Sequence, residues 1–183
     1  NMVAYQGSAA ANRIFSVIDK PIEIKNDVSL PNLETKNFDI KFNNTSFKYD
    51  TTSDKAISNI NLSIDGGKIT ALVGQSGAGK STIINLLPRF YDPQEGKILI
   101  DDQDIKKVNL SSLRNNISLV SQDVILFDDT IKNNIAYANS SANQKDIEDA
   151  CKFAAAEEFI NLLPDKYETM VGENGVKLSG GQK

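Results

Sequence analysis

The feature that most constrains the fold is the stretch GQSGAGKST, residues 74–82. It matches the pattern G-x-x-x-x-G-K-[ST], follows the apolar run ITALV and precedes the helical pattern KSTIINLL. Glycines let such a loop turn tightly, so that successive backbone N–H groups point toward one anion. A strand, this loop and a helix in that order predict an α/β unit that binds the phosphates of a nucleoside triphosphate.

The loop residues have different expected parts in binding. Lys80 would reach the outer phosphates, and Ser81 would place its hydroxyl on Mg²⁺. Because a charge-assisted hydrogen bond contributes roughly 1.5–3 kcal/mol, loss of Lys80 should weaken nucleotide binding about ten- to a hundredfold. The alternative is an ordinary glycine-rich turn, which does not account for both flanking elements. The predicted nucleotide contacts here are Gly74, Gln75, Ser76, Gly77, Ala78, Gly79, Lys80, Ser81 and Thr82.

Sequence periodicity places this unit within a longer arrangement. Residues 1–20 carry a thin apolar helical face that ends at Pro21, and residues 21–36 are polar and contain two prolines, so they are predicted to be an extended linker. Residues 37–129 are predicted to form a nucleotide-binding core with a β subdomain, and residues 130–183 a helical subdomain.

Within the core, FDIKF and INLSI alternate apolar and polar residues, which predicts half-buried antiparallel strands. The continuous apolar run ITALV predicts a strand covered on both faces, and GKILID and ISLVS predict two short strands. From Thr130 onward, TIKNNIAYA and NQKDIEDACKFAAAEEFINLL have helical patterns.

Composition excludes several classes of function. The chain has 183 residues, 40% of them hydrophobic, and a net charge of −4 without a clustered basic face, so no nucleic-acid partner is predicted. A single cysteine permits no internal disulfide, and the absence of histidine removes imidazole from any catalytic or metal site.

Further motifs occur in a fixed order around the loop. LSGGQ spans residues 178–182, Gln122 lies in LVSQDVILF, Tyr49 in SFKYD and Glu173 in VGEN. With the glycine-rich loop, these motifs make the chain resemble the ATP-binding cassette (ABC) family from about residue 37 onward. AANRIFSVIDKP is similar to the segment that joins the last transmembrane helix of exporter-type members to their nucleotide-binding domain.

The resemblance implies a P-loop NTPase (RecA-like) core with an antiparallel β subdomain and an α-helical subdomain. It implies ATP and Mg²⁺ as ligands, with Tyr49 stacking on adenine, Ser81 and Gln122 at the metal, and Lys80 and Gln122 serving catalysis. It also implies two partners: a second nucleotide-binding domain, identical or not, and a transmembrane domain of the same polypeptide. The location would be the cytoplasmic face of a membrane, the bacterial plasma membrane above all. The signature residues expected to touch the partner's ATP are Ser179, Gly180, Gly181 and Gln182.

Each motif alone has a simpler interpretation. Tyr49 could be a strand aromatic, Glu173 a loop charge, and LSGGQ a turn at a helix N-terminus with Ser179 as its N-cap. A non-transport ABC-type clamp of the chromosome or repair class is the alternative function, and a small-molecule kinase does not account for LSGGQ.

The stretch VILFDD imitates the Walker B strand, in which two acids follow an apolar run. It lies before the signature, whereas the family's Walker B follows it, so Asp128 and Asp129 are predicted to begin the helix TIKNNI instead. Walker B, its catalytic glutamate and the switch histidine are therefore expected beyond Lys183. The 183 residues resemble the first part of a nucleotide-binding domain, incomplete at its C-terminal end, and are not expected to hydrolyse ATP alone.

Overall fold

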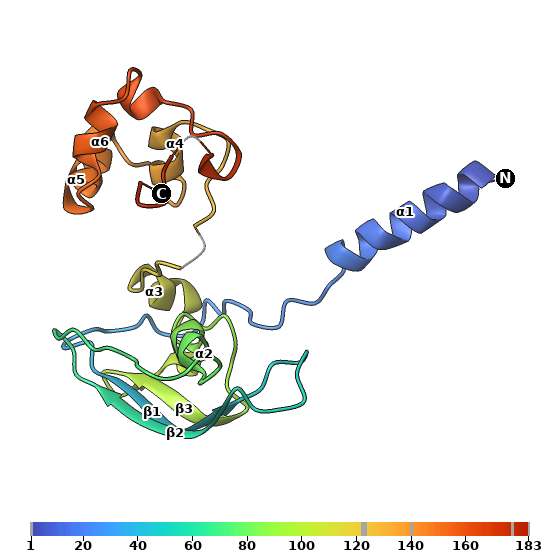
Figure 1. The fold of residues 1–183 in the computed structure, drawn as a ribbon. Helices are drawn as coiled ribbons and strands as arrows, with labels where there is room; N and C mark the ends of the chain where they lie inside the picture. Colours follow the sequence, from blue (N-terminus) through green and yellow to red (C-terminus); the bar gives the residue numbers. More distant parts are fainter. Residues whose placement is uncertain (1, 122–123, 140, 177, 183) are drawn as a thin grey trace. The chain divides into compact units, whose positions relative to one another are not determined.

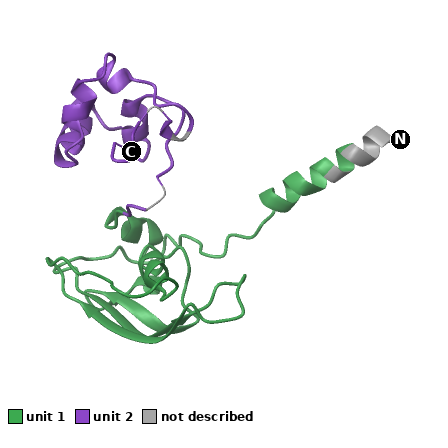
Figure 2. Ribbon diagram, viewed as in Figure 1, with its two compact units in different colours: residues 1–118 green, residues 119–183 purple. Residues whose placement is uncertain are grey.

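The computed structural model describes residues 2–121, 124–139, 141–176 and 178–182 (Figure 1). These residues form two compact units, 1–118 and 119–183, shown in different colours in Figure 2. No helix in the described ranges is long and apolar enough to cross a membrane.

The first unit is built on a four-stranded sheet with the order β2-β1-β3-β4. Every neighbouring pair is antiparallel, and Ile40 of β1 lies opposite Ile64 of β2 and Ile100 of β3. The predicted antiparallel β subdomain is thus confirmed. The strands are β1 (Ile40–Phe47), β2 (Ile57–Ile64), β3 (Glu95–Ile100) and β4 (Gln103–Asp104).

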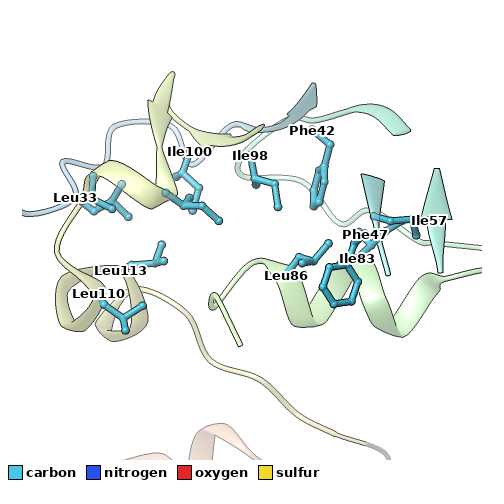
Figure 3. Packing of buried hydrophobic residues seen from close by; sticks show 12 residues of the cluster. Leu33, Phe42, Phe47, Ile57, Ile83, Leu86, Ile98, Ile100, Leu110 and Leu113 are labelled. Carbon is cyan, nitrogen blue, oxygen red and sulfur yellow. The ribbon is translucent and has the colours of Figure 1, made fainter. Parts of the chain in front are cut away.

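Two short helices and the sheet enclose one apolar core. Figure 3 shows side chains of α2 (Lys80–Leu86) and α3 (Leu110–Asn115) converging with those of β1 and β3. Leu86 and Leu113 are fully buried. The 3-10 helix η1 (Ile105–Lys107) joins β4 to α3 and adds Ile105 to this core. The core fixes α2, and therefore the glycine-rich loop at its start, against the sheet.

Two predicted strands are not strands in the structure. Residues 69–73 and 117–121 have no regular secondary structure, and Ile69, Val73 and Val120 are almost fully exposed. A buried strand needs hydrogen-bonded neighbours on both edges. No strand among the described residues pairs with either segment, so the apolar patterns predict strands that here lack partners.

The N-terminal helix α1 (Met2–Ile18) confirms the predicted helix. The linker that follows is irregular, as expected, but it is bound closely to the first unit. Leu33 enters the core, and Gln103 forms a pair of hydrogen bonds with the backbone of Glu34. The N–H of Leu33 donates to the Ser112 hydroxyl at 3.0 Å, and that of Asn109 donates to the carbonyl of Pro31 at 2.8 Å.

Asp101 holds the end of this linker. Its carboxylate accepts hydrogen bonds from four consecutive backbone N–H groups at 2.7–3.2 Å. The pKa of Asp101 lies below its usual value, chiefly because the N–H of Lys36 donates to the carboxylate. One side chain thus orders the turn that leads into β1. The donors are Lys36, Asn37, Phe38 and Asp39.

The second unit is helical. Its core comprises Ile131, Ile147, Cys151, Ile160 and Val171. The helices are α4 (Ile131–Ala136), α5 (Gln144–Phe153), α6 (Glu157–Asn161) and the 3-10 helices η2 (Lys166–Glu168) and η3 (Glu173–Gly175).

The continuous helical pattern of residues 143–163 is divided between α5 and α6. Ala155 has a φ of 54°, a left-handed conformation that ends an α-helix. At the start of α5, Asn143 and Asp146 form a reciprocal capping box. The division lets Ile160 of α6 and Cys151 of α5 share the core.

Candidate functional site

The glycine-rich loop is anchored against the first residues of β2. A Cβ atom built on Gly79 would lie 2.5 Å from Cγ2 of Ile57 and 2.7 Å from the carbonyl oxygen of Ala56. Gly79 also has a φ of 83° and is the residue from which α2 starts. Only glycine combines this conformation with so close an approach. The loop therefore has a defined place on the sheet.

The side chain of Lys80 lies across the loop. Its Nζ atom donates hydrogen bonds to the carbonyl oxygens of Gly74 and Gln75 at 2.9 and 2.7 Å. Among the described residues, no carboxylate lies within ion-pair distance of this ammonium group. The loop thus presents a positive charge that neutral carbonyl groups orient and that no described carboxylate neutralises, which suits a phosphate ligand.

The two hydroxyl residues that follow differ in environment. Ser81 is exposed, and within the described part of the chain its hydroxyl makes no hydrogen bond, so it is available to a ligand. Thr82 is buried, and its Oγ1 atom lies 3.2 Å from the hydroxyl of Tyr49, within hydrogen-bonding distance. This contact joins the predicted base-stacking residue to the helix that starts in the phosphate loop.

Tyr49 belongs to an aromatic cluster with Phe47 and Tyr91. The ring centroid of Tyr49 lies 4.8 Å from that of Phe47 and 5.1 Å from that of Tyr91, and the rings of both pairs are nearly perpendicular. The sequence motifs do not indicate that Phe47 and Tyr91 are neighbours of Tyr49. Both residues are aromatic and lie beside predicted elements, but this pattern does not predict that their rings contact Tyr49.

The second acid of VILFDD, Asp129, has a structural part. Residues 124–127 form no strand, and Thr130 is the N-cap of α4. The Asp129 carboxylate accepts hydrogen bonds from the side-chain amide of Asn133 and the backbone N–H of Thr130. Mainly the Asn133 bond holds the pKa of Asp129 below its usual value. The two acids were predicted to begin this helix, but they lie just before it, because Thr130 is its N-cap and Ile131 its first residue.

No group of three or more acidic, histidine or cysteine side chains that could hold a metal ion occurs among the described residues. Of the two predicted metal contacts, Ser81 lies within the described residues. The other, Gln122, lies outside the described residues.

The signature motif forms a turn in the second unit. The N–H of Ser179 donates to Oε1 of Gln182 at 2.9 Å, and the N–H of Gln182 donates to the carbonyl of Ser179 at 3.0 Å. The first bond is one half of a capping box, in which the side chain of the third helical residue, here Gln182, accepts from the backbone N–H of the N-cap, here Ser179. Ser179 is exposed, and so is Glu173 at the start of η3.

The two signature glycines differ from Gly79. A Cβ atom on Gly180 or Gly181 would meet no heavy atom within 4 Å, and neither residue has a left-handed φ. The described part of the chain therefore imposes no need for glycine at these positions.

Comparison with known proteins decides the family. The sequence model of the ABC transporter family matches residues 57–183. The chain belongs to the ABC transporter family. The resemblance and the P-loop NTPase fold class inferred from the motifs are thereby confirmed.

Individual ABC proteins are similar over nearly all of this chain. It is 47% identical over 186 residues to an ATP-dependent lipid A-core flippase of Syntrophus aciditrophicus, and covers 30% of that protein. It is 50% identical over 179 residues, 97% of this chain, to the flippase of the same description from Photorhabdus laumondii, again covering 30% of it. The solved structure of a bacterial Atm1-family ABC exporter with ATP bound superposes with a TM-score of 0.88 and 44% identity over 98% of this chain. The chain spans about a third of the length of these ABC proteins.

Proposed function

We propose that this chain is the ATP-binding part of an ABC exporter, in which ATP binding and hydrolysis drive a substrate across a membrane. The observation that carries the proposal is the joined geometry of the first unit. The Lys80 ammonium group, which has no ion pair with a described carboxylate, lies on a phosphate loop, and a hydroxyl contact links the α2 helix of that loop to the Tyr49 side chain. A phosphate site and an aromatic surface for a base are thus parts of one rigid structure.

ATP is the proposed ligand of this site. Backbone N–H groups of residues 74–82 would surround the phosphates, Lys80 would contact the outer phosphates, and Tyr49 would stack on adenine. The exposed hydroxyl of Ser81 fits a Mg²⁺ ligand, together with Gln122. Mg²⁺ would supply charge neutralisation at the β- and γ-phosphates. Lys80 and Gln122 are the residues that we assign to catalysis.

A second nucleotide-binding domain is the proposed partner at the signature. A Cβ atom on Gly180 or Gly181 would meet no described heavy atom within 4 Å, so the packing of the described residues does not explain the two glycines. A ligand held by another domain and approaching the backbone closely does explain them. We assign contacts with the partner's ATP to Ser179, Gly180, Gly181 and Gln182, within a helical subdomain of residues 130–183.

The proposed whole protein is an exporter with a transmembrane domain in the same polypeptide. Its nucleotide-binding domains would lie at the cytoplasmic face of a bacterial plasma membrane. The named relatives are a flippase and an exporter about three times as long as this chain. Ile14, Val17 and Ile18 of α1 are apolar and exposed, as expected of a helix that continues from another domain. The relatives argue against the alternative of a non-transport clamp, and no nucleic-acid partner is proposed.

The test uses the full-length protein in lipid nanodiscs. Lys80→Ala should weaken ATP binding about ten- to a hundredfold, because it removes a charge-assisted contact to phosphate, and should abolish ATPase activity. Lys107→Ala is the matched control, since Lys107 is an exposed lysine of the same unit that makes no ion pair with a described residue. Undiminished ATP binding by Lys80→Ala would refute the proposed site.

A further inference from the structure

The ring of Tyr49 lies where strand pairing no longer restrains it. β1 ends at Phe47, and the backbone turns directly after Tyr49, whose carbonyl accepts a hydrogen bond from the N–H of Thr52 at 3.1 Å. A side chain beyond the end of a strand has no cross-strand neighbour to restrict its rotamers. Its orientation therefore depends on contacts from other segments.

Tyr91 supplies such a contact. Its ring is nearly perpendicular to that of Tyr49, at 87° and 5.1 Å between centroids, and lies 5.3 Å from the ring of Phe47. Edge-to-face contact is a favoured arrangement of aromatic pairs, because the positive edge of one ring meets the negative face of the other. Together with the Thr82 hydroxyl, the two rings restrain Tyr49 through three contacts.

The segment that carries Tyr91 is itself rigid. Arg89 is 8% exposed and donates from Nε and Nη2 to the two carboxylate oxygens of Asp92, each at 3.0 Å. Its Nη1 atom donates to the carbonyl of Ile105 at 3.3 Å, which ties the segment to η1. A bidentate pair between a buried arginine and a half-buried carboxylate fixes geometry as well as charge. Tyr91 lies between Arg89 and Asp92 in the chain and is therefore held in place.

We propose that Tyr91 is a positioning residue for nucleotide binding, and that its ring fixes the orientation in which Tyr49 stacks on the base. This inference rests on the proposed function, because it requires a nucleotide base at Tyr49. Preorganisation of the Tyr49 ring would lower the entropy lost when the base binds. Loss of the Tyr91 ring would thus weaken binding of the base and leave binding of the phosphates unchanged.

Direct stacking of the base on Tyr91 is the competing explanation. Tyr91 is 39% exposed, and both tyrosines line one open hollow of about 470 Å³. A residue that acts through Tyr49 loses its effect when Tyr49 is removed, whereas a residue that contacts the base keeps it. A double-mutant cycle distinguishes the two.

The experiment measures the affinity of the full-length protein for ATP and for sodium tripolyphosphate by isothermal titration calorimetry, in EDTA so that no hydrolysis occurs. Tripolyphosphate carries the phosphates without a base. Tyr91→Leu should weaken ATP binding about two- to tenfold, the range of one aromatic pair, and leave tripolyphosphate binding unchanged. Tyr91→Phe keeps the ring and should bind ATP within about twofold of wild type. Unchanged tripolyphosphate affinity also shows that each variant is folded.

Tyr49→Ala should weaken ATP binding about five- to a hundredfold, the range of one stacked base. Tyr91→Leu should then cause no further loss in the Tyr49→Ala background. The proposal is overturned if the two losses multiply, if Tyr91→Leu weakens tripolyphosphate as much as ATP, or if it weakens neither.

Failure of the proposed function has a different signature. An unchanged ATP affinity of Tyr49→Ala, with Lys80→Ala defective for both ligands, would overturn base stacking and with it the part assigned to Tyr91. Lys80→Ala without effect on either ligand would overturn the nucleotide site itself.

Discussion

The close approach of Gly79 to β2 predicts an unusually large effect of one added methyl group. In Gly79→Ala the new Cβ would lie 2.5 Å from Cγ2 of Ile57 and 2.7 Å from the backbone carbonyl of Ala56. A left-handed φ disfavours any Cβ by about 1–2 kcal/mol. Forcing extra volume against fixed neighbours adds about 1–3 kcal/mol. Together these predict destabilisation by about 2–5 kcal/mol.

The neighbouring Gly77 provides the matched control. Its φ is 82°, almost the same as that of Gly79, but a Cβ there would meet no atom within 4 Å. Gly77→Ala should therefore show the conformational strain alone, about 1–2 kcal/mol. The difference between the two variants isolates the contact with β2.

Hydrogen-exchange mass spectrometry of peptides from β2 and α2 in the full-length protein measures the local free energy of opening. Because about 1.4 kcal/mol corresponds to a tenfold change, Gly77→Ala should speed exchange about five- to thirtyfold and Gly79→Ala about thirtyfold or more. Equal protection in the two variants would show that the loop can move away from Ala56 and Ile57, and would refute the rigid anchoring of the loop.

Three further predictions follow from the described contacts. Gly181→Ala should leave hydrogen-exchange protection of its own unit unchanged, because the added Cβ meets no described atom within 4 Å. The same variant should still bind ATP but lose ATPase activity at least tenfold. Retained activity would contradict a partner at the signature. Because the folded pKa of Asp101 lies below the ordinary 3.8, its contribution to stability is present above that value and is lost as the pH falls through the lowered pKa. Limited proteolysis should therefore cut residues 21–39 faster at low pH, and Asp101→Asn should show the same increase at neutral pH. A cleavage rate that neither change alters would contradict the assignment of Asp101 as the residue that orders the end of the linker. Leu86→Ala removes a fully buried side chain and should destabilise the first unit by about 2–5 kcal/mol, measured by hydrogen exchange. The control Ile84→Ala changes an exposed residue of the same helix and should have a much smaller effect. Similar losses in the two variants would contradict the assignment of Leu86 to the core.

The elements predicted correctly are those whose signals lie close together in the sequence. The alternating apolar residues Ile40 and Phe42 of β1, and Ile60 and Leu62 of β2, all contribute to the core, as their period of two predicts. The loop and α2 follow from closely spaced glycines, a lysine and an apolar helical pattern that ends before Pro88. The family likewise follows from short motifs and their order, because each motif is local. These features were determined by the sequence alone.

The tertiary structure decided what depends on a distant partner. The apolar run of residues 69–73 predicts a strand, but a strand also needs neighbours that its own letters do not name. The linker has no periodicity, yet Asp101, some sixty residues away, orders its backbone, as four hydrogen bonds show. Tyr49 and Tyr91 are single aromatic letters in separate segments, and only folding brings their rings together. In each case the deciding interaction joins residues far apart in the chain, so no local pattern could have predicted it.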